Sequence, residues 1–418
     1  MKKADSIDFS RSCLYNEIKN TIRGKRMEMR RLCASDYDEL LSMLNATFAN
    51  KYGREVDFLT AQPKMWVRDD GHMGRHLGIF EDGRLVSVAG IYPLPTVIAG
   101  ERCMFMTTGN VATLPGYEGR GYFTKIFSEL MGELESVGAD AARLGGARQR
   151  YARYGFESCG SSYRVEYNEI NRVRCFGESG ADIEFSRVLP SDFESLKFIT
   201  EIISKKPFYV TRGGADTDEQ YRALTTKHSL PYIAKRGGVP IGYLSASEKE
   251  AKVGAREWGE LITETGAASE DIRIEIINAW QKKLGKNISF TIAAHEQKLL
   301  SSFGACAEIM TLGIPSHFKI INFERITNAL MKLKASYTDM PRGEATLCIK
   351  DYGTLLLYNT GMECGCALTD KSADFTVDKM TAARLLYGPL LPTAFSGVSH
   401  NLAAFLPLPL SWNTLDYT

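Results

Sequence analysis

The segment Gly109 to Phe127, GNVATLPGYEGRGYFTKIF, constrains the fold of this chain more than any other. An apolar run ends at Pro115 and gives way to a glycine-bearing loop, which opens into residues with apolar side chains at helical spacing, namely Phe123, Ile126, Phe127 and Leu130. The pattern predicts a strand, a loop and a helix. The first N–H groups of such a helix point outward at the positive end of its dipole, which suits them to phosphate.

Two other interpretations of this loop were weighed. It could be an ordinary connection in which the glycines only relieve a tight turn. A nucleoside-triphosphate loop is disfavoured, because no Gly-Lys-Ser/Thr follows the glycines to engage phosphate and magnesium.

Length and charge narrow the class of protein. A chain of 418 residues exceeds the size of a single core and predicts two or three domains. Its 51 basic and 50 acidic side chains give a net charge of +1, which argues against a nucleic-acid or membrane partner recognised through bulk charge. We expect a small-molecule partner.

Neither the cysteines nor the histidines indicate a metal. The nine cysteines lack paired CxxC spacing, and we interpret them as reduced thiols. Cys364 and Cys366 could form a redox or metal pair, but they fit better as alternate residues on one face of a strand.

The N-terminus has no signal-peptide core, and no window offers the ~20 apolar residues that a membrane span needs. The sequence therefore predicts a soluble, cytoplasmic protein.

Around the glycine loop the sequence predicts an ordered domain that starts at Met27. A strand and a helix are followed by three strands, the helix Tyr122 to Val137, a strand at Ala141 to Gly145 and a helical turn from Arg148 to Phe156. The tetrapeptide Glu81-Asp82-Gly83-Arg84 is a hairpin turn between the second and third strands.

This order, with VATLPGYEGRGYF after the fourth strand, resembles the GNAT superfamily of acyl-coenzyme A dependent N-acetyltransferases. The family's phosphate loop, Gln/Arg-x-x-Gly-x-Gly/Ala, aligns with Glu118 to Phe123, where only Gly121 matches strictly. Glu118 places an anion near phosphate, and Phe123 replaces a small residue. Arg153-Tyr154-Gly155-Phe156 is similar to the family's late helix motif.

From Ile183 the pattern of the first domain starts again. LPYIAKRGGVPIGYLSAS parallels LGIFEDGRLVSVAGIY about 155 residues earlier, which indicates a second copy of the fold. At the place of the glycine loop this copy has Thr263 to Glu270, with two acids and no cation. We expect a structural, non-catalytic repeat that does not bind phosphate.

After Pro315 the pattern becomes α+β, with a helix, three strands, a helix and a proline-rich end. Two tandem GNAT-like mixed-sheet domains followed by a sterol-carrier-protein-like α+β domain resemble the enhanced intracellular survival family of bacterial acetyltransferases. The expected organisation is an N-terminal extension at 1–26, a catalytic GNAT domain at 27–170, a degenerate GNAT-like domain at 171–315 and the carrier-like domain at 316–418.

The resemblance implies a set of cofactor-binding residues for acetyl-coenzyme A and no metal. By family match, the pantetheine arm of the cofactor is lined by Val111, Ala112 and Thr113, and it is bordered from the fifth strand by Gly146 and Ala147. The pyrophosphate is held by the residues of the loop and of the first helical turn, namely Gly119, Arg120, Gly121, Tyr122, Phe123 and Thr124.

The same resemblance implies two catalytic residues. Tyr151 stands where the family has its general acid, and a phenol with a pKa near ~10 keeps its proton at neutral pH. Packing is the alternative role, and Tyr154 is the competing tyrosine. The family uses the carboxylate of its last residue as base, and here that residue is Thr418. One alternative is that Asp416 serves as the base. The other is that the chain end only anchors the fold. Because LPLPLSWNTLDYT is apolar and aromatic almost to its last residue, we expect an ordered, buried end.

The resulting prediction is an N-acetyltransferase that moves an acetyl group directly from acetyl-coenzyme A to a primary amine of a small molecule or a lysine side chain. The alternative is a non-catalytic protein that binds a ligand in the carrier-like domain and has a repurposed GNAT cleft. Family resemblance also implies a homo-oligomer, and a hexamer in particular.

Overall fold

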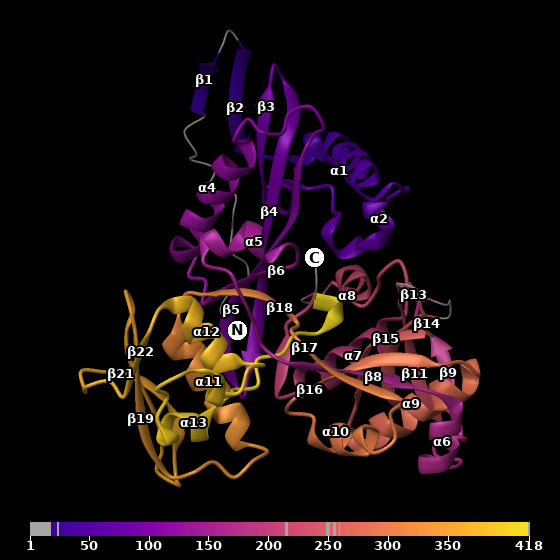
Figure 1. Ribbon diagram of the computed structural model, residues 1–418. Helices are drawn as coiled ribbons and strands as arrows, with labels where there is room; N and C mark the ends of the chain where they lie inside the picture. The colour runs from indigo at the N-terminus through magenta and orange to yellow at the C-terminus, as the bar shows by residue number, and fades with distance from the viewer. Residues whose placement is uncertain are drawn as a thin grey trace.

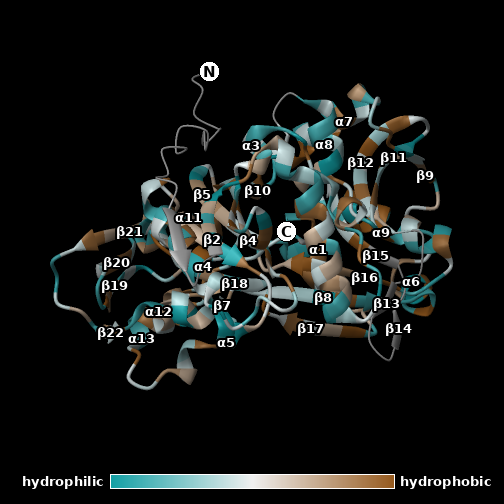
Figure 2. Cartoon of the chain, turned by 90° about the horizontal axis from the view of Figure 1, so that it is seen from above, coloured by the Kyte–Doolittle hydropathy of each residue, from teal (hydrophilic) through white to brown (hydrophobic). Residues whose placement is uncertain are grey.

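Three lobes meet around the C-terminal end of the chain (Figure 1). The computed structural model describes residues 18–22, 25–213, 216–247, 251–253, 256–258 and 260–416. The first lobe stands above the other two, and the last described turn of the chain, η5 (Thr414–Asp416), lies between the first and second lobes (Figure 1). Figure 2 shows the same molecule from above.

The first lobe is built on a mixed sheet in the order β1-β2-β3-β4-β5-β6-β18-β7, and β10 pairs with β4. Most neighbours are antiparallel, while β5 and β6 are parallel. The strands are β1 (Ile18–Ile22), β2 (Lys25–Arg31), β3 (His76–Glu81), β4 (Arg84–Ile98), β5 (Glu101–Thr113), β6 (Ala141–Leu144), β7 (Glu157–Cys159), β10 (Phe208–Val210) and β18 (Ser316–Ile320).

Two long helices, α1 (Tyr37–Tyr52) and α4 (Tyr122–Ser136), contribute apolar residues to the core of this sheet. Short helices complete the lobe: α2 (Phe58–Ala61), α3 (Asp70–Met73) and α5 (Arg148–Tyr151). Because successive strand residues face opposite sides, Met106 joins this core whereas Phe105 joins the core of the third lobe. One sheet therefore supports two cores.

The second lobe repeats the mixed sheet in the order β17-β8-β16-β15-β12-β11-β9. Its strands are β8 (Ser162–Tyr167), β9 (Ile183–Arg187), β11 (Leu230–Arg236), β12 (Val239–Ala246), β15 (Glu260–Ala267), β16 (Ile288–Ala293) and β17 (Ile309–Gly313), and a separate ribbon joins β13 (Ala251–Val253) to β14 (Arg256–Trp258). Its helices are α6 (Glu169–Phe176), α7 (Phe193–Ser204), α8 (Thr217–Ala223), α9 (Glu270–Leu284) and α10 (Gln297–Gly304). Hydrophobic residues recur along its central strands (Figure 2).

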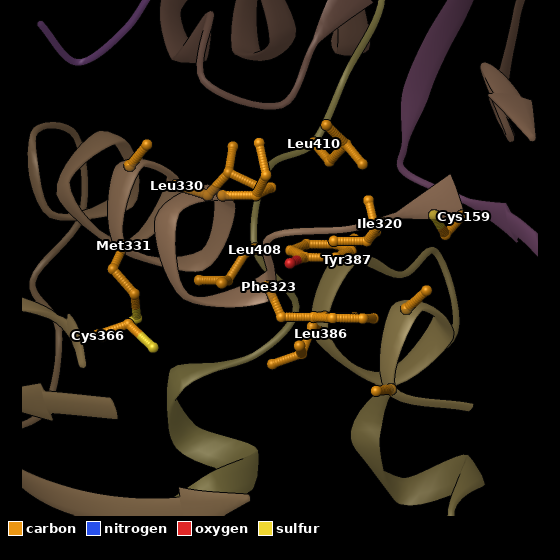
Figure 3. Close-up of a cluster of buried hydrophobic side chains, with 14 of the residues drawn as sticks. Cys159, Ile320, Phe323, Leu330, Met331, Cys366, Leu386, Tyr387, Leu408 and Leu410 are labelled. Carbon is orange, nitrogen blue, oxygen red and sulfur yellow. The ribbon is translucent and has the colours of Figure 1, made fainter. Parts of the chain in front are cut away.

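The third lobe has a four-stranded sheet in the order β21-β20-β19-β22. The strands are β19 (Gly343–Ile349), β20 (Gly353–Asn359), β21 (Cys364–Thr369) and β22 (Phe375–Val377), and the helices are α11 (Phe323–Ala335), α12 (Lys379–Tyr387) and α13 (His400–Phe405). Side chains from α11, α12 and the terminal segment, among them Leu330, Leu386 and Leu408, gather in one core (Figure 3).

The predicted two mixed-sheet domains and the α+β domain are confirmed, together with most of their elements. The helix predicted from about Ser269 is α9, with Ser269 as its cap, and the strand predicted at Ile288 to Ala293 is β16. The hairpin turn between β3 and β4 contains Asp82 and Gly83, both with positive φ.

Two strands cross between the predicted domain ranges. β8 lies within the predicted first domain but pairs with β16 and β17 of the second sheet, and β18 lies after the predicted second domain but pairs with β6 and β7 of the first. In addition, β1 lies within the expected N-terminal extension and pairs with β2 of the first sheet. Strand pairing is a tertiary contact that local sequence patterns do not encode, so the boundaries at 26, 170 and 315 stay a prediction.

Candidate active site

The site begins where two parallel strands of the first sheet separate. β5 and β6 pair only from Phe105 with Ala141 to Thr108 with Leu144, and β5 then continues to Thr113 while β6 ends. Just past that point Asn110 and Val111 together stand opposite Ala89 of β4, which is a β-bulge. Asn110 adopts φ 54°, a left-handed conformation that asparagine tolerates better than most residues. The sheet is therefore opened and bent beside the predicted pantetheine residues Val111, Ala112 and Thr113.

A buried polar network holds the bulge. The Asn110 side-chain amide donates to Tyr92 Oη at 2.6 Å and lies 3.2 Å from His76 Nε2, and that nitrogen is 2.7 Å from Tyr92 Oη. Burial lowers the pKa of His76 to about 4, so its imidazole is neutral near pH 7. Sequence patterns did not single out these residues, and only the unusual backbone of Asn110 marks them.

The glycine loop has the backbone shape expected of it. Gly116, Gly119 and Gly121 all have positive φ, between 74° and 85°, and a Cβ at any of them would meet nothing within 4 Å. The backbone conformation therefore favours glycine at these positions, whereas the space around them would admit a larger side chain. The Glu118 carboxylate folds back onto the loop and accepts from Gly116 N at 2.6 Å, which gives this anion a partner within the loop itself.

Arg120 is tied to the sheet. Its guanidinium donates to Glu81 Oε2 at 3.1 Å and to the Gly116 carbonyl at 2.9 Å. Tyr122 Oη also donates to Glu81 Oε2, at 2.6 Å. The buried Glu81 carboxylate thus fixes both the loop and the first residue of α4.

The N-terminus of α4 is open. Gly121 is the N-cap residue, no side chain caps the helix, and its first turn contains no acid. The Phe123 ring packs against two other aromatic rings. Its centroid lies 5.3 Å from that of Phe127 and 6.1 Å from that of Tyr151, and the Arg150 guanidinium lies 5.7 Å from it. Thr124 is exposed and accepts from Arg153 at 3.2 Å.

Tyr151, on α5, lies against the residues that follow β6. A Cβ at Gly146 would approach the Tyr151 ring to 3.0 Å, and Gly146 and Ala147 are themselves exposed. Tyr151 is only 6% exposed, and its ring packs on Phe127 at 5.2 Å. Burial raises the pKa of Tyr151 above its usual range, so the phenol is protonated at neutral pH. The predicted packing and acid roles both fit this position.

The terminal segment runs through the interior, as predicted, as far as the structure describes it. Leu408, Leu410, Trp412 and Leu415 are buried. Arg212 donates to both oxygens of the Asp416 carboxylate, from Nε at 2.9 Å and from Nη2 at 2.8 Å. Because its oxygens are engaged in this pair, Asp416 is poorly placed to serve as the substitute base. Thr418 lies outside the described residues.

Basic side chains surround the end of the segment. Arg143 of β6, fully buried, donates to the Asp416 carbonyl and to Thr107 Oγ1, both at 3.1 Å. Lys64, from the turn before Trp66, donates to the Leu415 carbonyl, and burial lowers the pKa of Lys64 to about 8. Sequence patterns missed all these anchors, although a lone arginine in the apolar strand AARL was a usable signal.

Two buried carboxylates make acid stability a direct test of this packing. Burial raises the pKa of Glu264, but the charges of Arg212 and Lys206 lower it to about 2, and Arg273 brings that of Glu296 to about 2 in the same way. Both carboxylates have a lower pKa in the folded state than in the unfolded state. The stability that they give the folded protein is therefore present above about pH 4.5 and is lost as pH falls towards 2. The urea midpoint should therefore drop steeply below pH 4.5.

The matched variant for that measurement is Glu296→Gln. It removes one of the two titrating groups. The number of protons taken up on unfolding between pH 4.5 and 2, which the slope of unfolding free energy against pH reports, should therefore decrease by about one. An unchanged slope would show that Glu296 does not titrate in this range.

Among the described residues, no group of three His, Cys, Asp or Glu side chains is arranged to hold a metal ion. None of the helices in the described ranges combines the length and apolarity required to cross a bilayer.

Comparison with known proteins agrees with the fold and the glycine loop. The family described as "Acetyltransferase (GNAT) domain" matches residues 28–159, a range that begins within β2, runs through β6 and includes the loop and Tyr151. No curated protein matches the sequence.

Solved structures match almost the whole chain at low identity. A GCN5-related N-acetyltransferase from Anabaena variabilis is 14% identical with a TM-score of 0.62, and covers 94% of this chain and 100% of its own. A GCN5-related N-acetyltransferase from Kribbella flavida is 15% identical with a TM-score of 0.60, and the match covers 94% of this chain and 99% of the Kribbella protein. Eis1 from Mycobacterium abscessus is 16% identical with a TM-score of 0.60, covering 92% and 99%. At such identity the likeness is one of fold. The chain thus contains a GNAT acetyltransferase domain at residues 28–159, and nearly its full length shares the fold of Eis1.

Proposed function

We propose that this protein transfers an acetyl group from acetyl-coenzyme A directly to a primary amine, on a small molecule or a lysine side chain. The observation that carries the proposal is the open N-terminus of α4, which follows a loop of three left-handed glycines beside the separation of β5 and β6. Uncapped N–H groups at a helix N-terminus are a ready site for a pyrophosphate.

The residues around this opening fit acetyl-coenzyme A. Gly119, Arg120 and Gly121 are exposed, and Tyr122 and Thr124 follow them on the first turn of α4. Val111 to Thr113 on one side, and Gly146 and Ala147 on the other, border the space where the strands part. Phe123 packs towards Tyr151, so its size is accommodated by the aromatic group.

When bound, acetyl-coenzyme A supplies a thioester whose carbonyl is open to attack by an amine. The chain must then stabilise negative charge on the carbonyl oxygen and protonate the departing sulfur. Main-chain N–H groups at the Asn110–Val111 bulge can serve the first need. Tyr151 is protonated at neutral pH, and it can serve the second.

The terminal carboxylate of Thr418 is the proposed base. The described part of the segment ends among Lys64, Arg143 and Arg212, whose positive charges would keep a nearby carboxylate ionised and able to accept a proton. The acceptor amine would then enter from the junction of the first and second lobes, where the segment ends (Figure 1).

Two measurements test the activity itself. Calorimetry should register acetyl-coenzyme A binding, and a thiol reagent should detect free coenzyme A when polyamines, aminoglycosides or lysine peptides are supplied. Absence of binding would contradict the proposal, and binding without turnover on any amine would favour the non-catalytic alternative.

Tyr151→Phe tests the proposed acid. The variant keeps the ring packed on Phe127 and removes only the phenol proton, so kcat should fall by roughly 10²-fold or more. Acetyl-coenzyme A binding should change little.

Tyr154→Phe is the matched control for that experiment, because Tyr154 belongs to the same aromatic group and its Oη accepts from Arg153 at 3.1 Å. Its kcat should stay near that of the parent protein. If Tyr154→Phe loses activity and Tyr151→Phe does not, the acid is Tyr154.

The other implications of the family resemblance stay predictions. These are a sterol-carrier-like role for the third lobe and a hexameric assembly. Sedimentation measurements on the purified protein would decide the assembly.

A further inference from the structure

One border of the proposed cofactor opening cannot fix its own shape. The segment between β6 and α5 is Gly145-Gly146-Ala147, and all three residues are exposed. None of them has a side chain that can form a hydrogen bond, and two successive glycines leave the backbone free to adopt many conformations. If this segment is to border a ligand in one conformation, a group outside it must hold it there.

That group comes from a distant part of the chain. β18 lies between β6 and β7 in the first sheet, and there His317 stands opposite Leu144 of β6 and Ser158 of β7. The His317 ring extends past the end of β6, and its Nε2 lies 2.9 Å from the Gly146 carbonyl oxygen. A strand that follows the second lobe in sequence therefore holds the loop of the first.

The two hydrogen bonds of His317 define the role of each ring nitrogen. A carbonyl oxygen only accepts, so Nε2 carries the hydrogen and donates it to Gly146. In the neutral ring Nδ1 is then an acceptor, and Ser158 Oγ, 2.8 Å away, donates to it. Ser158 thus orients the imidazole, and the imidazole orients the Gly146 carbonyl.

The other end of the segment is tied to the same group of strands. Arg148, the first residue of α5, donates from Nε and Nη2 to the two carboxylate oxygens of Glu157 on β7, at 2.8 and 2.9 Å. Glu157 is buried. Ala147 therefore lies between two anchored residues, Gly146 before it and Arg148 after it.

Fixing the Gly146 carbonyl also fixes the direction of the Ala147 N–H. The peptide bond between them is trans, and in a trans peptide the C=O and N–H bonds point in opposite directions. β18 and β5 lie on opposite sides of β6, so this N–H points away from β18 and towards the side where β5 and β6 separate. It has no hydrogen-bond partner among the described residues. A main-chain donor is thus presented to the opening.

We propose that His317 is a positioning residue for the cofactor: it holds the Gly146–Ala147 peptide so that the Ala147 N–H donates to an amide carbonyl of the pantetheine arm. The arm is uncharged and contains two amide groups, whose carbonyls require such donors. This role rests on the proposed binding of acetyl-coenzyme A. It is confined to the arm, because the nucleotide half of the cofactor would be held at the N-terminus of α4.

Two matched substitutions separate the two ring nitrogens of His317. His317→Gln places an amide N–H near the position of Nε2 and can still donate to Gly146, whereas the shorter side chain in His317→Asn can replace only Nδ1. Calorimetry on the full-length protein should show acetyl-coenzyme A binding about fivefold weaker in His317→Asn, as expected for one hydrogen bond, and within about twofold of the parent protein in His317→Gln. Parent-like binding in His317→Asn, or an equal loss in both variants, would overturn the proposal.

A second probe distinguishes positioning of the arm from a general disturbance of the fold. The nucleotide half of coenzyme A, 3′-phosphoadenosine 5′-diphosphate, lacks the arm, so its affinity should be the same in the parent protein and in His317→Asn. If this nucleotide loses as much affinity as acetyl-coenzyme A does, His317 does not act on the arm and the proposal is wrong. A parent protein that binds no acetyl-coenzyme A would contradict the proposed function, and this role of His317 with it.

Discussion

Replacing Arg212 with methionine should lower the free energy of unfolding by about 3–5 kcal/mol, because the change leaves two carboxylates buried without their shared partner. Arg212 bridges Glu264 at 2.6 Å and Asp416 at 2.8 Å, and all three side chains are less than a tenth exposed. Urea unfolding at pH 7 would measure the loss. Because Asp416 belongs to the terminal segment, the variant should also lose acetyl transfer, even where it remains folded.

Lys371→Met is the control for this change. Lys371 pairs with Glu344 at 2.7 Å on the surface of the third lobe, with both side chains about half exposed. Such pairs contribute at most about 1 kcal/mol. Similar losses in the two variants would mean that the Arg212 pairs contribute no more than a surface ion pair.

Deleting Tyr417 and Thr418 should reduce kcat by roughly 10²-fold or more while acetyl-coenzyme A binding stays within about twofold, because the proposed base is lost and the cofactor opening is not. The deletion leaves Asp416 as the last residue, and its side chain is still held by Arg212. Calorimetry for binding and coenzyme A release for turnover would separate the two effects. Turnover equal to that of the intact chain would remove Thr418 from the mechanism.

Two further changes distinguish the carboxylate from the side chain. Thr418→Ala keeps the terminal carboxylate and should retain activity. Addition of Gly-Gly after Thr418 keeps every native side chain but moves the carboxylate, and should cause the same loss as the deletion. If Thr418→Ala is as impaired as the deletion, the side chain and not the carboxylate is required.

The elements around the glycine loop could be predicted because their causes are local. The positive φ values at Gly116, Gly119 and Gly121 follow from residue type. The apolar spacing of Ile126, Phe127 and Leu130 fixed the buried face of α4. The same holds for the repeat of the hairpin in β11 and β12.

The anchors of the chain end could not be predicted, because their partners are far apart in sequence. Arg143 meets the carbonyl of Asp416, Lys64 meets that of Leu415, and Arg212 meets the Asp416 side chain. No window of sequence contains both members of any of these pairs. The Asn110 network has the same origin, since β3, β4 and β5 each supply one member.

The sequence alone thus determined the type of each lobe, the phosphate-suited loop and the burial of the terminal segment, because periodicity, glycine conformation and hydrophobicity act within a few residues. Only the tertiary structure decided that β8 belongs to the second sheet and β18 to the first, that cations from two lobes surround the chain end, and that the second lobe has a cavity lined in part by ion pairs. These features depend on strand pairing and on buried ion pairs, whose free energy arises when distant segments exclude water together.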